Sequence, residues 1–164
     1  MEIGIASEAD IPVIKMLAEK IWPDAYTGII SAAQIRYMLG LIYSESALKT
    51  QMQNGHRFIF ALEESIPVGF ASFSKKSSEE PKTFRLHKLY VLPNLHGKGI
   101  GVFLLNQVIE ESQTAGGDTL ELNVNKHNPA KLFYERKGFT ILREEVLDIG
   151  EGYVMDDFVM VKNI

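Results

Sequence analysis

A glycine-rich turn in the second half of the chain carries the clearest chemical signal. A strand-like run reaches Leu89-Tyr90-Val91, and the turn His96-Gly97-Lys98-Gly99-Ile100-Gly101 follows shortly after it, leading into apolar residues at helical spacing. Glycines at alternate positions let the backbone approach a ligand and turn its N–H groups toward it. The start of a helix adds the positive end of its dipole. The stretch therefore predicts a phosphate or pyrophosphate site, with Lys98 and His96 as nearby charges.

Two other phosphate-binding motifs are excluded by the order of residues. A nucleoside-triphosphate P-loop needs a Ser or Thr after its lysine, whereas Lys98 is followed by glycine. A dinucleotide fingerprint needs a different spacing of its third glycine, although Glu121 lies near the expected acidic position. The turn also begins past the middle of a short chain, which leaves no room for a doubly wound sheet. A tight turn without a ligand is the remaining alternative, but it would not need three glycines.

The elements that must position this turn alternate between helical and strand-like patterns. Ser7 with Asp10 and Ser31 with Gln34 are typical of helix N-termini, and Trp22-Pro23 is expected to end the first helix. Asn128 before Pro129 is a suitable N-cap. The expected strands are 3–5, 58–62, 68–73, 83–91, 120–124, 139–147 and 154–161, and the expected helices lie near 8–22, 32–43, 45–54, 100–114 and 129–137. This order predicts one mixed α/β domain over residues 1–164.

Composition and charge narrow the classes of protein. The chain has 164 residues, no cysteine and a formal net charge of −4. The absence of a basic excess argues against a nucleic-acid binder. The absence of cysteine excludes disulfides and thiolate sites, and suits a reducing compartment. No signal peptide or membrane-spanning run is recognisable. Together these features lead us to expect a cytoplasmic protein. His127 has no partner at metal-ligand spacing, so we expect no metal site.

Two motifs about 30 residues apart resemble the GCN5-related N-acetyltransferase (GNAT) family. The glycine turn is similar to its acetyl-CoA signature, with His96 where Arg or Gln is usual. Asn125, Ala130, Phe133-Tyr134 and Gly138-Phe139 match the family's second pattern. The resemblance implies the GNAT fold, with a mostly antiparallel central sheet and flanking helices. The cofactor-binding residues that it implies for acetyl-CoA are Leu89, Tyr90, Val91, His96, Gly97, Lys98, Gly99, Ile100, Gly101, Asn125, Asn128 and Tyr134.

The resemblance also implies the chemistry, which is attack of an amine on the thioester of acetyl-CoA. Tyr134 matches the tyrosine that protonates or hydrogen-bonds the leaving sulfur. An alkylamine is mostly protonated at pH 7, because its pKa is about 10.4, so a base or a water relay is useful. His87 lies where relatives often carry a glutamate base, and Glu121 is a second candidate. A packed histidine and a core tyrosine are the plain alternatives.

The acceptor is predicted from the first helices and the last hairpin. In this family these regions build the acceptor site, and here they contain aromatic and acidic residues: Trp22, Tyr26, Tyr37, Tyr43, Asp24, Glu45, Asp156 and Asp157. Trp22, Tyr26, Tyr43 and Asp156 are the candidate substrate residues, since such groups suit a cationic amine. Trp22-x-x-x-Tyr26, Tyr37-Met38, Tyr43-Ser44 and Tyr153 to Asp157 are similar to bacterial polyamine N-acetyltransferases of the PaiA type. Spermidine or spermine is therefore the leading acceptor.

Other acceptors and a different class of protein stay open. A protein N-terminus or lysine is the next acceptor, followed by an aminoglycoside. A non-catalytic acyl-CoA-binding or regulatory module on the same fold is the alternative from another class, because fold alone does not determine function. The resemblance is compatible with a homodimer.

Overall fold

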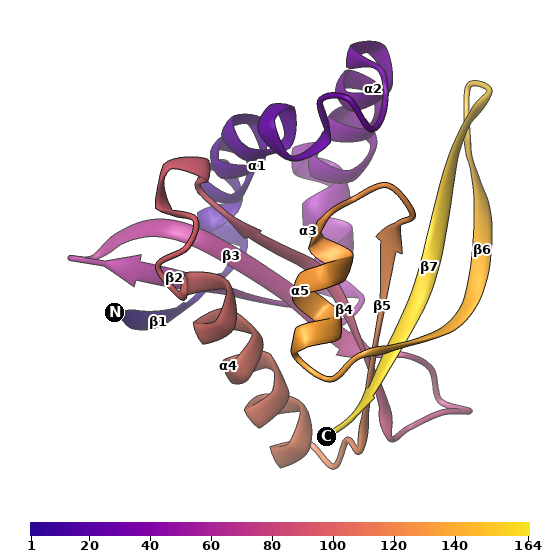
Figure 1. Cartoon of the computed structure of the whole chain (residues 1–164). Coiled ribbons are helices and arrows are strands. Elements are labelled where there is room, and N and C mark those ends of the chain that lie inside the picture. Colours follow the sequence, from indigo (N-terminus) through magenta and orange to yellow (C-terminus); the bar gives the residue numbers. More distant parts are fainter.

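The computed structural model describes residues 1–164, whose helices and strands alternate along the whole chain (Figure 1). In chain order the elements are β1 (Glu2–Ile5), a 3-10 turn η1 (Glu8–Asp10), α1 (Ile11–Tyr26), α2 (Ala32–Tyr43), α3 (Glu45–Gln53), β2 (Arg57–Glu63), β3 (Ile66–Lys75), β4 (Thr83–Val91), η2 (Pro93–Leu95), α4 (Ile100–Thr114), β5 (Thr119–Asn125), α5 (Ala130–Arg136), β6 (Thr140–Gly150) and β7 (Tyr153–Asn163). None of the helices is long and apolar enough to cross a membrane.

All seven strands belong to one sheet of order β1-β2-β3-β4-β5-β7-β6. Neighbouring strands are antiparallel except β4 and β5, which are parallel and are joined through α4. The β4–β5 pairing runs only from Thr83 opposite Thr119 to Leu86 opposite Leu122. Both strands continue beyond this pairing, to Val91 and Asn125. The sheet is therefore split between the carboxyl-terminal halves of β4 and β5, and this split positions the functional site.

A β-bulge lies on β4 at the point where the split begins. Phe73 pairs with Leu86 and Ser72 pairs with Lys88, so His87 is an extra residue without a partner on β3. An extra residue bends a strand and redirects the side chains that follow it. Beyond the bulge, β4 turns away from β5 and toward the helices at the amino-terminal end.

Each face of the sheet carries its own hydrophobic cluster. Helices α1, α2 and α3 pack on one face, where the cluster includes Ile14, Leu17, Leu48 and Phe70. Helices α4 and α5 pack on the other, with Leu104, Leu105, Leu120 and Phe139 among the buried side chains. In Figure 1, α1 to α3 lie in the upper part of the view, and α4 and α5 lie lower and in front of the sheet. The split thus opens between two packed layers.

The predicted capping residues are confirmed, although Ser7 caps the turn η1 that precedes α1, and the predicted end of the first helix is wrong. Ser31 Oγ accepts from the Gln34 N–H at 3.1 Å, and Asp10 Oδ2 accepts from the Ser7 N–H at 2.8 Å. Helix α1 continues through Pro23 to Tyr26. A proline inside a helix loses one backbone hydrogen bond. Burial of the Trp22 and Tyr26 rings, whose centroids lie 4.4 Å apart, offsets this loss and holds the last turn against the core.

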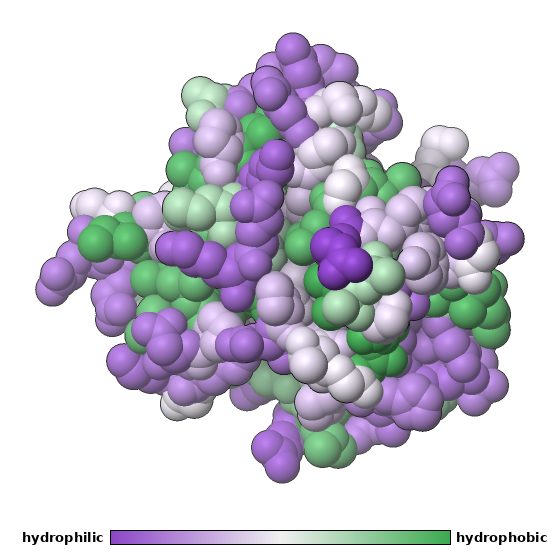
Figure 2. All heavy atoms as spheres, turned by 90° about the horizontal axis from the view of Figure 1, so that it is seen from above, coloured by the Kyte–Doolittle hydropathy of each residue, from purple (hydrophilic) through white to green (hydrophobic).

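The carboxyl-terminal hairpin extends beyond the helices and leaves β6 as a free edge (Figure 1). Apolar side chains remain exposed along this edge strand, among them Ile141, Leu142 and Val146. Seen from above, hydrophilic side chains cover much of the visible surface and apolar ones form smaller patches between them (Figure 2). The hairpin still contributes to the interior, because Val159 and Met160 of β7 are buried.

We expect Gly117→Ala to destabilise the protein by about 1–3 kcal/mol, the usual range for overpacking a core. A Cβ at Gly117 would lie 2.6 Å from Phe84 Cδ2 and 2.9 Å from the Ser112 carbonyl oxygen, so the turn between α4 and β5 must move. Urea unfolding followed by circular dichroism measures the change in the free energy of unfolding.

Gly40→Ala is the matched comparison for this prediction. A Cβ at Gly40 meets nothing within 4 Å. Because Gly40 lies inside α2, alanine should stabilise the chain there by up to about 1 kcal/mol. Equal effects of the two substitutions would contradict the proposed close contact at Gly117.

Candidate active site

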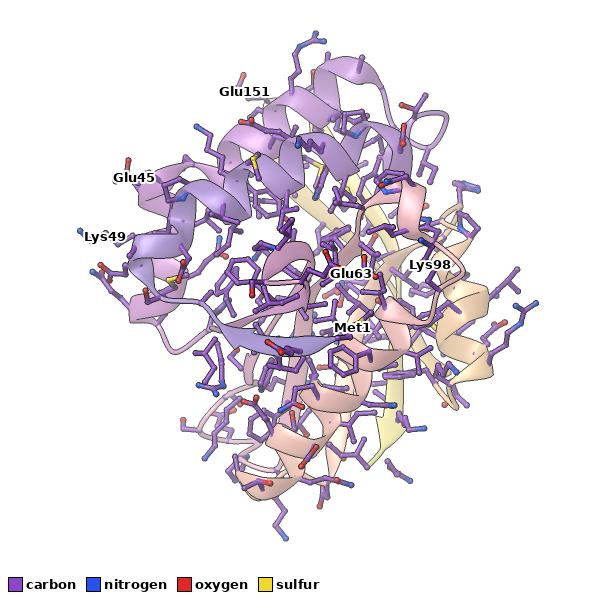
Figure 3. The ribbon with its side chains drawn as sticks, turned by 90° about the vertical axis from the view of Figure 1, so that its left-hand side faces the viewer. Met1, Glu45, Lys49, Glu63, Lys98 and Glu151 are labelled. Carbon is purple, nitrogen blue, oxygen red and sulfur yellow. The ribbon has the colours of Figure 1, made fainter.

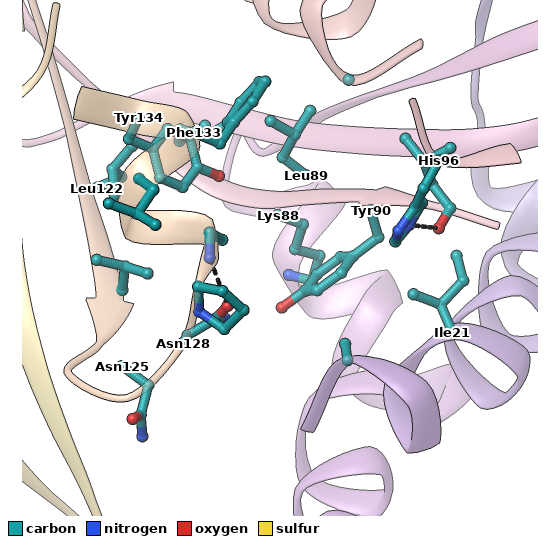
Figure 4. A pocket seen from close by; sticks show the side chains of 18 of the residues that line it. Ile21, Lys88, Leu89, Tyr90, His96, Leu122, Asn125, Asn128, Phe133 and Tyr134 are labelled. Atoms are coloured by element: carbon teal, nitrogen blue, oxygen red, sulfur yellow. Dashed lines mark hydrogen bonds between the residues drawn. The ribbon is translucent and has the colours of Figure 1, made fainter. Parts of the chain in front are cut away.

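A cavity of about 890 Å³ opens where β4 and β5 separate (Figure 4). Its walls come from the split halves of both strands, the turn before α4, the helix α5, the end of α1 and one face of β7. The volume lies in the range of sites that enclose a small organic ligand. The parts of the chain that line it are 86–91, 95–97, 99–102, 122–125, 128–134 except Lys131, Arg136, Lys137, Ile21, 24–26, Met155 and Asp157.

The glycine turn forms one end of the cavity. Gly97 and Gly99 have φ values of +81° and +79°, in the left-handed region that side-chain-bearing residues rarely adopt. Gly99 is the N-cap of α4, and a Cβ at either glycine would meet nothing within 4 Å. The first N–H groups of a helix have no intrahelical partner. They therefore border open space beside the cavity, which is the arrangement that an anionic group needs.

The two charged residues of the turn have different positions. His96 Nε2 lies 3.0 Å from the Val91 carbonyl oxygen, so its ring ties the turn to the end of β4. Figure 4 shows this contact as a dashed line. Lys98, labelled in Figure 3, belongs to the turn but is absent from the cavity wall. A direct ligand contact of Lys98 remains a prediction.

Tyr134 lies on α5 and points toward the cavity (Figure 4). Its ring packs edge-on against Phe133 and Phe139, with centroid distances of 5.2 and 5.5 Å. Burial raises the pKa of its phenol well above the ordinary value, so the hydroxyl keeps its proton across the physiological pH range. This geometry gives the cavity one fixed hydrogen-bond donor.

His87 lines the cavity but is held as a neutral imidazole. Its Nε2 lies 2.7 Å from Ser74 Oγ, and its ring stacks on that of His56 at a centroid distance of 4.0 Å. Burial, with the positive charges of His56, Lys88 and Arg85 nearby, lowers the pKa of His87 to about 3. A general base works best with a pKa near the working pH, so this environment does not favour the predicted base role.

The two predicted asparagines both line the cavity and both stabilise local turns. Asn128 Oδ1 accepts from the Ala130 N–H at 2.9 Å, which confirms its capping of α5. Asn125 Oδ1 accepts from the His127 N–H at 2.9 Å. Since each carbonyl oxygen is used within the protein, the NH₂ groups are the parts that can serve a ligand.

Only one of the four predicted substrate residues reaches the cavity. Tyr26 lines it, and its hydroxyl lies 2.9 Å from that of Tyr90. Trp22 and Tyr43 are buried in the helical core, where the Trp22 Nε1–H donates to the Tyr43 hydroxyl at 3.3 Å. Asp156 faces the other side of β7 and pairs with Lys126 at 2.9 Å. The structure thus does not bring Trp22, Tyr43 or Asp156 into the cavity.

Asp157 and Asp24 are the acidic residues that line the cavity. Neither was among the four chosen from the sequence. Side chains alternate between the two faces of a strand, and Asp157 is buried together with Val159 two residues later. The alternation in β7 could have indicated that Asp157, rather than Asp156, points inward.

Glu121, the second candidate base, is enclosed by cations. Its side chain is 1% exposed and pairs with Lys76 at 3.2 Å, Arg85 at 3.1 Å and Arg143 at 3.5 Å. The carboxylate does not line the cavity. We infer that it joins β4, β5 and β6 below the split.

Comparison with known protein families decides the family of the chain. Residues 29–154 match the family described as "Acetyltransferase (GNAT) domain". The chain belongs to the GNAT acetyltransferases. The predicted fold is confirmed by this match and by the seven-stranded, mostly antiparallel sheet. The resemblance read from the two sequence motifs is confirmed at the level of the family.

Several GNAT proteins are similar to this chain. A probable N-acetyltransferase of Mycobacterium tuberculosis is 27% identical over 147 residues, which covers 86% of this chain and 80% of the relative. The L-methionine sulfoximine/L-methionine sulfone acetyltransferase of Salmonella typhimurium is 28% identical over 89 residues, or 53% of this chain and 52% of that protein. The structure of PaiA N-acetyltransferase from Thermoplasma acidophilum in complex with coenzyme A superposes with a TM-score of 0.81, 25% identity and full coverage of both chains.

Proposed function

We propose that this GNAT protein transfers the acetyl group of acetyl-CoA to a small cationic primary amine of the polyamine class, such as spermidine or spermine. One observation carries the proposal. The cavity that borders the helix N-terminus at Gly97–Gly101 is also lined by Asp24, Asp157 and Tyr26. An anionic cofactor and a cationic acceptor would thus share one cavity and meet beside Tyr134.

The residues present fit acetyl-CoA. The open space next to Gly97 and Gly99 leaves room for a pyrophosphate close to the N–H groups of α4. Leu89, Tyr90 and Val91 have no partner on β5, so backbone groups on that side, apart from the Val91 carbonyl that His96 contacts, can bind the pantetheine arm. Asn125 and Asn128 add amide donors. The relative from Thermoplasma acidophilum was solved in complex with coenzyme A, which supports this assignment.

Acetyl-CoA, when bound, supplies a thioester whose carbonyl carbon an amine can attack. The role of Tyr134 is to donate a hydrogen bond from its protonated hydroxyl to the sulfur, which stabilises the leaving group. The hydrophobic rings around Tyr134 exclude water from this contact, and a low local dielectric strengthens it.

The acceptor end of the cavity suits an ammonium group. Two carboxylates attract the cation, and the Tyr26 and Tyr90 rings offer aromatic faces beside them. A protein N-terminus or lysine remains the second candidate acceptor, since each presents the same primary amine. The match to an amino-acid acetyltransferase keeps amino acids on the test panel as well.

The test is release of CoA from acetyl-CoA, followed with a thiol reagent, across polyamines, amino acids, N-terminal peptides, lysine peptides and aminoglycosides. A chain without cysteine gives this assay a clean background. We expect the highest kcat/KM with spermidine or spermine. Turnover restricted to peptides would overturn the polyamine assignment. CoA binding without turnover on any amine would indicate a non-catalytic acyl-CoA-binding module.

A further inference from the structure

We propose that Asp157 binds the attacking amino group and accepts the proton that it loses, while Asn123 and Arg85 hold the carboxylate in position. The inference rests on the proposed function, because it needs a primary amine at the acceptor end of the cavity. It assigns the role of general base to Asp157 on β7 instead of His87 on β4.

The first observation is a buried carboxylate oxygen without a partner. Asp157 is 4% exposed and lines the cavity. Its Oδ2 accepts from Asn123 Nδ2 at 3.3 Å, whereas its Oδ1 has no hydrogen-bond partner in the protein. A buried oxygen without a donor is costly, and each such group in a native protein calls for an explanation. An ammonium group in the cavity would supply the missing donor.

The second observation is a network that fixes the carboxylate. Arg85 Nη2 donates to Asn123 Oδ1 at 2.6 Å, and Nη1 of the same guanidinium donates to Glu121 at 3.1 Å. Arginine has donors only, so the Asn123 oxygen must face it. The Asn123 NH₂ group must then face Asp157 and Glu145, the latter at 2.7 Å. The orientation of Asp157 is therefore set from β4 through β5.

The third observation is that no cation of the protein pairs directly with the neighbouring carboxylates of Asp157 and Glu145. Asp157 and Glu145 are direct partners in the β6–β7 register, and one neutral amide donates to both. Arg85 is the nearby cation, and its Nη1 and Nη2 donate to Glu121 and Asn123 and not to either of these carboxylates. A cationic substrate would balance this pair of carboxylates.

The groups that act on Asp157 come from five elements. Burial, followed by the charges of Glu145 on β6 and Asp156 on β7, raises its pKa, and the Asn123 hydrogen bond and Arg85 on β4 oppose this shift. Tyr26 on α1 lines the same cavity, and its pKa is raised by burial and, to a smaller extent, by the Asp157 charge. A carboxylate with a raised pKa is a stronger base than an ordinary aspartate.

The proposed step is balanced. The acceptor binds as an ammonium ion and first gives one proton to solvent, because only the neutral amine has the electron pair needed for attack. The amine nitrogen then forms a bond to the acetyl carbon, and the carbon–sulfur bond breaks with its electron pair on sulfur. The proton released from nitrogen goes to Asp157 Oδ1, and the Tyr134 hydroxyl hydrogen-bonds the departing sulfur. Since the nitrogen becomes far more acidic as its new bond forms, a carboxylate can take that proton even though a free alkylamine has a pKa of about 10.4.

The decisive experiment compares Asp157→Asn with Asp156→Asn in the full chain. The two residues are adjacent on β7, but the Asp156 side chain is 46% exposed and pairs with Lys126 outside the cavity. We expect D157N to lower kcat/KM about 10²-fold for the best amine of the panel, within the usual range for a general base. D156N should keep most of the activity. Calorimetric titration should give the same CoA affinity for both variants and wild type.

Two readouts separate this role from a merely structural one. The folded-state pKa of Asp157 is raised, so its ionisation costs stability as the pH rises through that pKa. D157N should therefore have a higher Tm than wild type at pH 7 while losing activity. In addition, the acidic limb of the pH profile of kcat at saturating amine should disappear in D157N and persist in His87→Gln.

The outcomes also separate this inference from the proposed function. Full activity of D157N, or loss of the acidic limb in His87→Gln instead, would overturn the role of Asp157 and leave the acetyltransferase assignment intact. A preference for peptides or amino acids with D157N inactive would overturn the polyamine assignment and support Asp157. A chain that acetylates no amine would overturn both.

Discussion

Replacing Tyr134 by phenylalanine should lower kcat about 10³-fold, within the range for loss of a positioned proton or hydrogen-bond donor. The substitution removes one oxygen atom and leaves the ring contacts with Phe133 and Phe139 in place. The leaving sulfur then loses its hydrogen-bond donor beside the Phe133 ring. KM for acetyl-CoA should change little, because the hydroxyl acts on charge that develops during the reaction. Steady-state kinetics with the best amine of the panel measures both constants.

Tyr153→Phe is the matched control for this experiment. It makes the same chemical change on the carboxyl-terminal hairpin, where the Tyr153 ring packs at a tilt against Tyr37 at a centroid distance of 5.2 Å and does not line the cavity. It should retain wild-type kcat. If Tyr134→Phe had the same kcat as this control, the hydrogen bond to the leaving sulfur would come from solvent and not from Tyr134.

Replacing Gly99 by valine should weaken CoA binding about 10- to 100-fold. A β-branched residue at a φ of +79° is strongly disfavoured, so the turn must change its backbone. The N–H groups at the start of α4 then lose their alignment with the pyrophosphate. Hydrogen bonds to a charged group contribute about 1.5–3 kcal/mol, which corresponds to this loss of affinity. Calorimetric titration with CoA gives the dissociation constant.

The opposite end of the same helix provides the control for Gly99. Gly116 follows α4, has a φ of +91°, and a Cβ there would also meet nothing within 4 Å. Gly116→Val should cause a similar backbone strain without affecting CoA. If both valine variants lost affinity equally, the effect would be one of stability, and the glycine turn would not be the pyrophosphate site.

Most elements of the fold could be predicted from local sequence. The capping residues Ser31 and Asn128 and the strand patterns depend on neighbours within a few residues, and the structure confirms them. The end of α1 could not be predicted in this way. Proline opposes a helix locally, but the burial of Trp22 and Tyr26 depends on strands far along the chain. Tertiary packing outweighed the local signal there.

The residues of the site differ in the same way, since some could be predicted from local sequence and others depend on tertiary structure. The glycine turn and Tyr134 belong to continuous motifs, so sequence alone indicated both. The low pKa of His87 follows from its burial and from its neighbours His56, Lys88 and Arg85, which strand register and tertiary packing bring together. The cluster of Asp157, Asn123 and Arg85 joins β4, β5 and β7, and β7 pairs with β5 although β6 lies between them in the sequence. No spacing along the chain reveals it.

Because the β4–β5 pairing is short, the sheet consists of two halves that only a few backbone hydrogen bonds connect. Four residue pairs, from Thr83–Thr119 to Leu86–Leu122, hold β1–β4 to β5–β7 by backbone contacts, and Glu121 reinforces the join through Arg85. A ligand bound in the split contacts both halves of the sheet and therefore links them. Ligand binding therefore raises the free energy of unfolding, by an amount that grows with ligand concentration. The opening that admits the reactants is also the place where they strengthen the protein.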